Sequence, residues 1–415
     1  MKEERVILHS DLNCFYASVE TVLDPSLEGK AVAVCGSTEE RHGIVLAKSE
    51  RAKRMGVKTG MTNCEARCLC PELIIVPPRF EKYVEFSSLV RNIYYEYTDR
   101  VEPYGLDECW LDVTGSRRLF GNGENIANSL REQIKTRLGL TVSVGVSFCK
   151  SFAKLGSDMK KPDAVTVLSR ENYAERIRNL PAGELIFVGR ATCRKLSTYG
   201  INTLGDIARL KREVLEELLG VRGGYIWDCV SGQDSSPVIH KDYKFPVKSV
   251  GHGITCTDDL VSVREVGQVF LELTREIGHK LRKHKMLARG VSIAVKNSSL
   301  GVRMHQCTLN EPTRNPLELA RAAKELFCSN YGSYFPAVRA LTVTAINLCD
   351  ENTVCQTDLF SDFSRSKKND RLVDALDDIN IRFGDKKIFP LSLKEIKKLP
   401  EGSSHETTLP GNYIR

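Results

Sequence analysis

Between residues 6 and 168, short runs rich in β-branched residues alternate with longer runs of helical periodicity. The strand-like runs lie at residues 6–10, 31–35, 43–47, 73–76, 101–103, 109–113, 142–148 and 164–168. Apolar spacing predicts helices at about 81–97, 125–138 and 150–159. The first strand and the segments after residue 80 follow the order strand, helix, strand, strand, helix, strand. This order predicts a split-βαβ sheet backed by helices.

The rest of the chain predicts further modules. Residues 180–232 are helical and punctuated by glycine, and residues 233–245 show no periodicity and are typical of a linker. Residues 246–350 return to strand and helix signals, and the chain is polar beyond residue 350. Because 415 residues exceed what one hydrophobic core usually holds, we expect two to four domains in an α+β arrangement.

Composition argues against a membrane or secreted protein. No run approaches the roughly 20 apolar residues of a membrane helix, and the first residues lead into a strand without a signal-peptide pattern. We therefore expect a cytoplasmic protein. The 14 cysteines are scattered singly and lack paired C-x-x-C knuckles, which predicts reduced, mostly buried thiols rather than a zinc site.

Positive charge is concentrated in one segment. The net charge is +7, and residues 244–350 contain 15 Lys and Arg against 9 Asp and Glu, a difference of +6. A basic module on a nearly neutral body favours a polyanionic partner such as nucleic acid. Basic surfaces also serve solubility, so charge alone leaves both interpretations open.

Three carboxylates are the main candidates for chemistry. Asp11 follows the first strand, while Asp107 and Glu108 are adjacent in a predicted hairpin turn at residues 104–108. If that strand lies beside the hairpin, the acids meet at one sheet edge, where like charges need a cation. Clustered oxygen ligands suit Mg²⁺. Acids in a turn are also ordinary turn chemistry, so this pair alone decides nothing.

Longer motifs around these acids resemble the Y family of lesion-bypass DNA polymerases. The first is His9-Ser-Asp-Leu-Asn-Cys-Phe-Tyr-Ala-Ser-Val-Glu20, and the second is Tyr104-Gly-Leu-Asp-Glu-Cys-Trp-Leu-Asp112. The third combines Val144-Gly-Val-Ser, Ala153-Lys-Leu and Asp158-Met-Lys-Lys-Pro162. Their order matches the family, and the resemblance extends from residue 5 to about 350.

The resemblance implies a right-hand polymerase. Its ferredoxin-like palm would comprise residues 1–12 and 76–168, and its small fingers residues 13–75. A helix-hairpin-helix thumb would span residues 169–233. A linker at 234–245 would lead to a DNA-binding α/β little finger at 246–350, followed by a tail at 351–415.

The resemblance also implies the roles of individual residues. Asp11, Asp107, Glu108 and the carbonyl of Leu12 would hold two Mg²⁺ ions. Tyr16 matches the steric gate, whose ring leaves no room for a ribose 2′-hydroxyl. A second set would bind the incoming dNTP: Phe15, Tyr16, Lys53 and Lys161.

Several positions depart from the family pattern. Lys53 stands where many members have arginine, and lysine lacks the bidentate fork of that side chain. Glu50 and Ala47 replace phosphate-contacting residues, so those contacts are not expected. Gly105 replaces a serine and Asn13 an acid, which we expect to loosen the turn and weaken catalysis.

Contacts with primer-template DNA are expected from two regions. Glycine lets backbone N–H groups approach phosphate, which favours the turns around Val188-Gly189-Arg190 and Gly220–Gly224. The basic segment adds its entry lysine and the end of its first helix. The predicted DNA contacts are Gly189, Arg190, Gly220, Gly223, Lys248, Lys280, Arg282 and Lys283.

A short motif predicts a protein partner. Gln356-Thr-Asp-Leu-Phe360 resembles the pentapeptide that binds the bacterial sliding clamp. Leu359 and Phe360 would enter an apolar groove while Gln356 forms hydrogen bonds at its edge. We expect the polymerase itself to be a monomer.

Two other functions remain open at this stage. A nucleotide cyclase also uses a split-βαβ sheet with two metals, although the thumb and the basic segment argue against it. A DNA-binding factor that lost its chemistry through Gly105 and Asn13 is the second alternative. Dependence on a primer-template would exclude the cyclase, and loss of extension on altering Asp107 would exclude the inactive factor.

Overall fold

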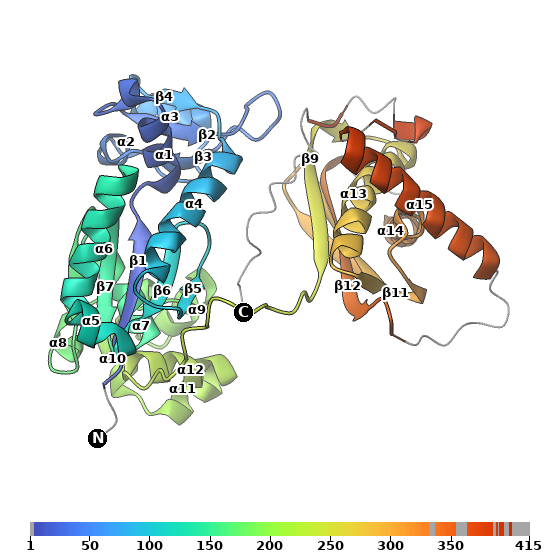
Figure 1. Ribbon diagram of the computed structural model, residues 1–415. Coiled ribbons are helices and arrows are strands. Elements are labelled where there is room, and N and C mark those ends of the chain that lie inside the picture. Colours follow the sequence, from blue (N-terminus) through green and yellow to red (C-terminus); the bar gives the residue numbers. More distant parts are fainter. Residues whose placement is uncertain are drawn as a thin grey trace. The chain divides into compact units, whose positions relative to one another are not determined.

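The computed structural model describes residues 4–331, 337–353, 363–384, 387–388, 390–393 and 398–400. The chain folds into two compact units, made mainly of residues 4–244 and 245–400 (Figure 1). Each unit has its own buried apolar core. The first unit contains every predicted metal ligand, so its main sheet is the part of the fold that matters for the site.

That sheet has five strands in the order β5-β6-β1-β7-β8. The strands are β1 (Ile7–Leu12), β5 (Val101–Pro103), β6 (Glu108–Asp112), β7 (Val142–Ser147) and β8 (Val165–Leu168). Strand β1 lies between β6 and β7 and is antiparallel to both, whereas β7 and β8 are parallel. The predicted split-βαβ sheet is confirmed.

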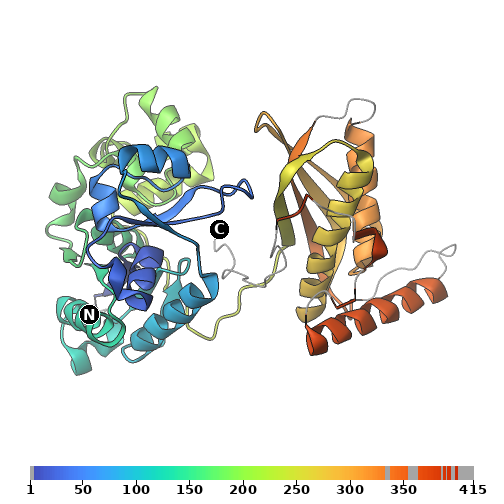
Figure 2. The same cartoon turned by 90° about the horizontal axis from the view of Figure 1, so that it is seen from above.

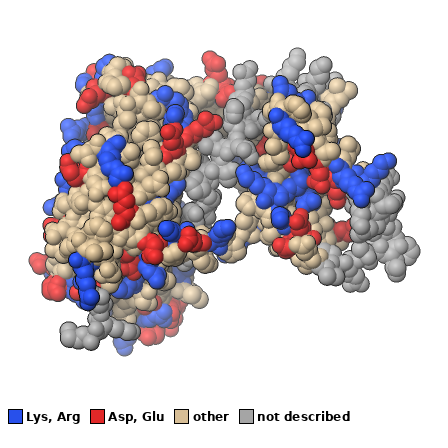
Figure 3. All heavy atoms as spheres, viewed as in Figure 1, with Lys and Arg blue, Asp and Glu red and all other residues tan. Residues whose placement is uncertain are grey.

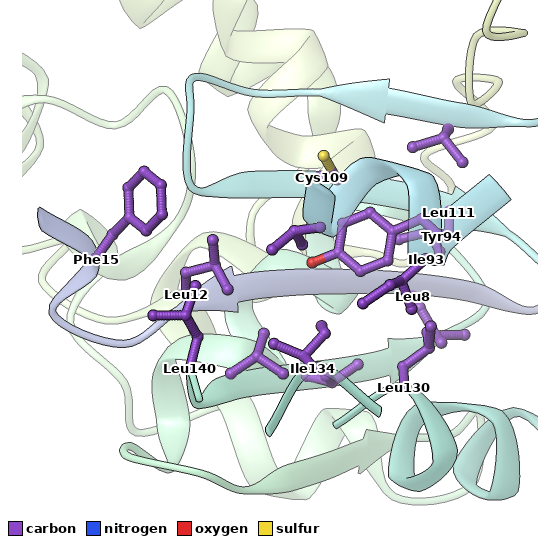
Figure 4. Close-up of a cluster of buried hydrophobic side chains, with 14 of the residues drawn as sticks. Leu8, Leu12, Phe15, Ile93, Tyr94, Cys109, Leu111, Leu130, Ile134 and Leu140 are labelled. Carbon is purple, nitrogen blue, oxygen red and sulfur yellow. The ribbon is translucent and has the colours of Figure 1, made fainter. Parts of the chain in front are cut away.

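Helices cover both faces of this sheet. Helices α4 (Phe80–Tyr95) and α6 (Gly123–Leu138) pack on one face and α7 (Lys150–Met159) on the other. Because side chains alternate along a strand, Leu8 and Leu12 enter the core on the α4 and α6 side (Figure 4). Ile7, His9 and Asp11 then face α7, which places the first predicted ligand beneath that helix.

A smaller sheet follows the first strand in sequence. Its strands β2 (Val32–Cys35), β3 (Val45–Lys48) and β4 (Ile74–Val76) have the order β3-β2-β4. The helices of this region are α1 (Phe15–Leu23), η1 (Pro25–Leu27), α2 (Glu50–Arg54) and α3 (Asn63–Leu69). Helix α1 starts three residues after β1 ends, so Phe15 and Tyr16 are carried close to the edge where Asp11 lies.

The glycine-punctuated region is helical, as predicted. It contains α8 (Tyr173–Ile177), η3 (Ala182–Glu184), α9 (Arg190–Ser197), α10 (Leu204–Arg209), α11 (Arg212–Leu219) and α12 (Val221–Val230). Its core includes Phe148 and Phe152 from the end of β7 and from α7. Two short elements, η2 (Thr114–Ser116) and α5 (Arg117–Phe120), precede α6.

The predicted linker has no helix or strand, but its first half is not a free tether. The buried Asp234 carboxylate accepts hydrogen bonds from the Ser151 amide at 3.1 Å and hydroxyl at 2.6 Å. Val238 is buried in a cluster with Trp110, and the Ile239 amide donates to Glu102 at 3.0 Å. Contacts between distant segments hold this stretch, and a local sequence pattern does not reveal them.

The second unit is built on a four-stranded antiparallel sheet of order β11-β10-β12-β9. Its strands are β9 (Val250–Leu260), β10 (Met286–Asn297), β11 (Val302–Thr313) and β12 (Val338–Asp350). Helices α13 (Val263–Lys283) and α14 (Pro316–Tyr331) pack against each other and against the sheet (Figure 2).

Beyond residue 350 the structure contains a helix that the sequence analysis did not predict. Helix α15 (Phe363–Phe383) occupies part of the segment read as a polar tail, and η4 (Leu391–Leu393) follows it. Asp377 on α15 accepts a hydrogen bond from Arg282 at 2.8 Å and lies 3.0 Å from His279. Ion pairs therefore join α15 to α13.

Unpaired cysteines are spread through both units. The 13 cysteines in the described part of the chain are all free, and Cys109 and Cys149 are buried close to the main sheet. Burial raises the pKa of each of these two thiols to about 12. Six of the 13 are buried, four are partly buried and three are exposed, so the expectation of mostly buried thiols holds only in part.

Replacing Gly145 should separate α7 from the sheet. A Cβ atom on this β7 residue would lie 1.9 Å from the Ala153 carbonyl oxygen and 2.5 Å from the Ser157 amide nitrogen. We expect Gly145→Ala to lower the free energy of unfolding by about 1–3 kcal/mol or more, measured by thermal and urea denaturation. Gly115→Ala is the control, because nothing lies within 4 Å of its added Cβ. Equal stability of the two variants would contradict this packing.

Candidate active site

Two of the predicted ligands face each other across neighbouring strands. Asp11 on β1 is the direct partner of Glu108, the first residue of β6, so both side chains project from the same face of the sheet. Asp107 precedes Glu108 in the hairpin turn, and its carbonyl accepts a hydrogen bond from the Leu12 amide at 2.9 Å. The structure thus brings the acids of two distant motifs to one place.

Lysines on α7 and just after it contact these acids. The Lys154 ammonium lies 2.9 Å from Glu108, 3.3 Å from Asp11 and 3.3 Å from Asp158. Lys161 lies 2.7 Å from Asp11 and 2.8 Å from Asp158. Lys161 was predicted from the sequence to bind the nucleotide, whereas Lys154 and Asp158 had no predicted role. The spacing of four residues between Lys154 and Asp158 is the signal that could have placed these two side chains on one face of the helix.

Burial makes Asp11 and Asp107 costly to ionise. Burial raises the pKa of Asp107 to about 6, and the charges of Glu108 and Asp11 add to the shift. Burial, followed by the charge of Glu108, also raises the pKa of Asp11, although the two lysines act in the opposite direction. The site therefore carries more negative charge than its surroundings compensate, and a cation would relieve it.

The carboxylates of Asp11 and Glu108 could hold a divalent ion if the Lys154 ammonium moved away. Across the described residues, no three His, Cys, Asp or Glu side chains are already arranged as metal ligands. Asp11 and Glu108 nevertheless share one cation, the Lys154 ammonium, and both offer the hard oxygen atoms that Mg²⁺ prefers. The carboxylates are suitable, and the lysine occupies the space between them.

His9 is a buried neighbour that the sequence analysis did not assign. Its side chain is fully buried, with Nδ1 2.9 Å from the Ser157 hydroxyl and Nε2 3.4 Å from Glu108. The Ser157 hydroxyl donates to the Lys154 carbonyl at 2.7 Å and so accepts from Nδ1–H. Burial, and then the charge of Lys154, lower the pKa of His9 well below its usual value.

The two aromatic residues after β1 have different environments. Phe15 is 4% exposed and belongs to the core of the main sheet, as Figure 4 shows, so its predicted contact with the nucleotide gains no support. Tyr16 is half-buried, and its ring stacks on Tyr83 with centroids 4.1 Å apart. Burial, and then the charge of Asp107, raise the pKa of the Tyr16 phenol.

Gly105 and Asn13, the two departures from the family pattern that were expected to weaken catalysis, both fit their structural positions. Gly105 has φ +87°, a conformation that favours glycine, so the glycine suits the turn rather than loosening it. Asn13 binds away from the acids: its amide accepts from Ser143 at 2.9 Å and donates to Thr141 at 3.3 Å. The amide ties β1 to β7, and neither departure removes a ligand.

The predicted phosphate contact Lys53 lies at the edge of this region. Its half-exposed ammonium is 3.5 Å from Glu50, whose carboxylate accepts from the Cys14 thiol at 3.3 Å. Lys53 is therefore near the start of α1 but makes no contact with Asp11 or Glu108 among the interactions of the described residues. Its role toward a triphosphate stays a prediction.

The predicted DNA contacts of the first unit divide into two groups. Gly189, Arg190 and Gly220 are exposed, and nothing lies within 4 Å of a Cβ placed on either glycine. Gly223 is buried, and its added Cβ would lie 1.8 Å from the Leu215 carbonyl oxygen. The absence of a side chain at Gly223 is explained by the close approach of α12 to α11, so a phosphate contact there is not supported.

The basic residues of the second unit also differ. Lys248 and Lys283 are exposed and Lys280 is half-buried, and Lys and Arg side chains are prominent on the face of this unit in Figure 3. Arg282 is engaged by Asp377 at 2.8 Å and Asp374 at 3.9 Å. A phosphate contact by Arg282 would have to replace these acids.

Two predictions concern partners and location. The predicted clamp-binding residues Gln356, Leu359 and Phe360 lie outside the described residues. No helix in the described part of the chain is long and apolar enough to cross a membrane.

Family comparisons cover most of the chain. Residues 10–158 match the impB/mucB/samB family, and residues 247–359 match the C-terminal domain of the same family. The fold resembles the Y-family DNA polymerase chimera Dbh-Dpo4(243-245)-Dbh with a TM-score of 0.74. That match has 24% identity and covers 83% of this chain and 99% of the chimera.

Sequence relatives are similar over nearly their full length. DNA polymerase IV of Acetivibrio thermocellus is 46% identical over 92% of this chain and 95% of that protein. DNA polymerase IV 1 of Bacillus subtilis is 34% identical over 97% of this chain and 96% of that protein. The chain therefore belongs to the Y family of DNA polymerases and is close to the DNA polymerase IV proteins.

Proposed function

We propose that this protein extends the 3′-hydroxyl of a DNA primer with two Mg²⁺ ions held by Asp11, Asp107, Glu108 and the carbonyl of Leu12. As a Y-family member it is a DNA-directed DNA polymerase of the lesion-bypass kind, and such polymerases depend on divalent metal. The observation that carries the proposal is the pairing of Asp11 with Glu108 across β1 and β6, with Asp107 beside them.

The bound ions would supply Lewis-acid activation of the primer hydroxyl and charge stabilisation at the leaving pyrophosphate. Asp11 and Glu108 are already aimed at one cation, since Lys154 lies within 3.3 Å of both. Lys154 would leave this position on metal binding and keep its 3.3 Å contact with Asp158 on the same helix. The protein would thus exchange an internal cation for the catalytic ones.

The lysines and aromatic residues would bind the nucleotide. Lys161 is 26% exposed and held by two acids, so it would turn toward the triphosphate once a metal neutralises Asp11. Lys53 would add a more distant positive charge. Tyr16 would lie under the sugar and exclude a 2′-hydroxyl. Phe15 would support Tyr16 from the core rather than touch the nucleotide, given its burial.

We assign the remaining segments from the family resemblance. The five-stranded sheet would be the palm, residues 13–75 the fingers, residues 169–233 the thumb and residues 246–350 the little finger. Gly189, Arg190 and Gly220 would contact DNA phosphates from the thumb, and Lys248, Lys280 and Lys283 from the little finger. Gln356, Leu359 and Phe360 would bind the sliding clamp, with the polymerase a cytoplasmic monomer.

The two alternatives identified from the sequence have less support. The family matches include the C-terminal domain at residues 247–359, which a nucleotide cyclase would not need. The inactive-factor alternative relied on Gly105 and Asn13, and both residues fit their structural positions without displacing an acid. Polymerase activity is the function that the site supports best.

Asp107→Asn tests the chemistry. Loss of one charged ligand should lower primer extension by at least roughly a hundredfold, the scale of removing one group that stabilises transition-state charge. Affinity for primer-template DNA, measured by fluorescence anisotropy, should stay the same. Glu132→Gln, an exposed acid on α6, is the control and should extend normally. Normal extension by Asp107→Asn would contradict the proposal.

Metal binding should depend on pH through Asp107. Because the folded-state pKa is raised from 3.8 to about 6, ionisation destabilises the metal-free fold at pH 7.5, and the loss is recovered as the pH falls below about 6. Mg²⁺ should therefore raise the melting temperature at pH 7.5. At pH 5 it should bind about tenfold more weakly, since a proton must leave. Thermal shift and calorimetry with EDTA controls measure both. A pH-independent affinity would exclude this linkage.

Tyr16→Ala tests the steric gate. Removing the ring should raise the ratio of kcat/KM for rNTP to that for dNTP by at least about tenfold, which corresponds to roughly 1.4 kcal/mol. The measurement is single-nucleotide extension with each substrate. Tyr94→Phe is the control, because this buried tyrosine forms its hydrogen bond with Ser10 rather than stacking on Tyr16. An unchanged ratio for Tyr16→Ala would reject the assignment.

A further inference from the structure

The ring of Tyr16 is oriented by a second aromatic residue. Tyr16 and Tyr83 stack with an interplanar angle of 9° and a centroid distance of 4.1 Å. Phe80 meets both rings edge-on, 6.2 Å from Tyr16 and 5.9 Å from Tyr83. Tyr83 is fully buried on α4. The plane of the half-buried Tyr16 ring is therefore set by a ring that is itself fixed.

A buried carboxylate in turn holds Tyr83. Glu20 is 2% exposed, and its Oε1 accepts a hydrogen bond from the Tyr83 hydroxyl at 2.6 Å. Its Oε2 accepts from Arg79 Nε at 2.9 Å and from the terminal Nη2 of the same guanidinium. Burying a carboxylate is costly unless donors and an opposite charge compensate it, and here both are present.

The helix geometry joins these contacts into one unit. Tyr16 and Glu20 are four residues apart on α1 and lie on the same helical face. The two donors to Glu20 lie at the start of α4: Arg79 is its N-cap residue, and Tyr83 is in its first turn. Tyr83 thus meets α1 twice, through its ring at Tyr16 and through its hydroxyl at Glu20. A shift of either helix would rotate the Tyr16 ring or break a buried charged hydrogen bond.

A comparison within α4 separates this role from simple packing. Tyr94 is also a buried tyrosine, and its hydroxyl forms a 2.6 Å hydrogen bond with Ser10. The aromatic contacts of Tyr16 are with Phe15, Phe80 and Tyr83. Two buried tyrosine hydroxyls therefore exist on one helix, and Tyr83 is the one whose ring stacks on the predicted gate.

We propose that Glu20, together with Arg79 and Tyr83, is a positioning group that fixes the Tyr16 ring and so sets the discrimination between deoxyribose and ribose. The inference rests on the proposed gate role of Tyr16. Glu20 and Tyr83 act through Tyr16 and make no contact of their own with the nucleotide. Loosening them lets the ring tilt and admit a 2′-hydroxyl while the ring itself remains present.

The test is a double-mutant cycle on the full-length protein. Glu20→Gln and Tyr83→Leu are made in the parent chain and in the Tyr16→Ala chain, and kcat/KM is measured for one dNTP and its rNTP. In the parent, Tyr83→Leu should raise the rNTP-to-dNTP ratio by at least about threefold, a size that the loss of one aromatic pair supports. Glu20→Gln should raise it in the same direction. In the Tyr16→Ala chain neither change should raise the ratio further.

Controls distinguish positioning from loss of stability. Tyr94→Phe removes a buried hydroxyl from the same helix and should leave the ratio unchanged. Tyr83→Phe keeps the stacked ring and serves where Tyr83→Leu is too unstable to purify, with an expected rise between those of the parent and Tyr83→Leu. Because the readout is a ratio, the fraction of folded enzyme cancels.

Two results would overturn the inference while leaving the gate intact. The first is an increased ratio for Tyr16→Ala with no increase for the Glu20 and Tyr83 variants. The second is an increase that adds fully to that of Tyr16→Ala, because the residues would then act independently of the ring. An unchanged ratio for Tyr16→Ala itself would reject the proposed gate, and the positioning role with it.

Discussion

The register of β1 between β6 and β7 is the constraint on which the candidate active site depends. Side chains alternate along a strand, so a slip of one residue would turn Asp11 into the α4 and α6 core and bring Leu12 to the α7 face. The correct register has Leu8 and Leu12 fully packed in the core, and it pairs Asp11 with Glu108. Hydrophobic burial on one face thus positions the carboxylates on the other.

Lysines on and just after α7 offset the negative charge of the acids on this face of the sheet. Its Lys154 contacts three acids, and Lys161 just beyond the helix contacts two of them. Burial opposes the charged form of Lys154, but the charges of Glu108, Asp11 and Asp158 outweigh it and raise the pKa of that lysine. Close contact between α7 and β7 at Gly145 holds this helix against the sheet. Packing and electrostatics therefore support the same arrangement.

Much of the fold could be predicted because its signals are local. Alternation and helical spacing located the strands and helices of the main sheet, and the motifs singled out Asp11, Asp107 and Glu108 as candidate metal ligands. Contacts between distant segments could not be predicted in this way. Asp234 bound to Ser151, and Arg282 bound to Asp377, depend on tertiary proximity. Helix α15 was missed because the segment is rich in charge and its apolar spacing is weak.

The structural roles of two glycines, Gly105 and Gly223, also could not be predicted from the sequence. From the sequence, Gly105 differs from the usual serine only by the loss of a hydroxyl. Its positive φ is a property of the folded turn and cannot be read from the sequence. Gly223 looked like a phosphate contact, yet it faces the backbone of α11. A glycine in a sequence shows only that a side chain is absent. The structure is needed to show which atoms occupy the space that a side chain would fill.

The buried thiols next to the site have a chemical consequence. Cys109 follows Glu108 directly, and Cys149 is the N-cap residue of α7. With pKa values near 12, both are protonated at neutral pH, and a thiol reacts with peroxide mainly as the thiolate. Cys64 and Cys328, by contrast, are exposed to solvent. The two buried thiols beside the candidate site are therefore slow to react with peroxide.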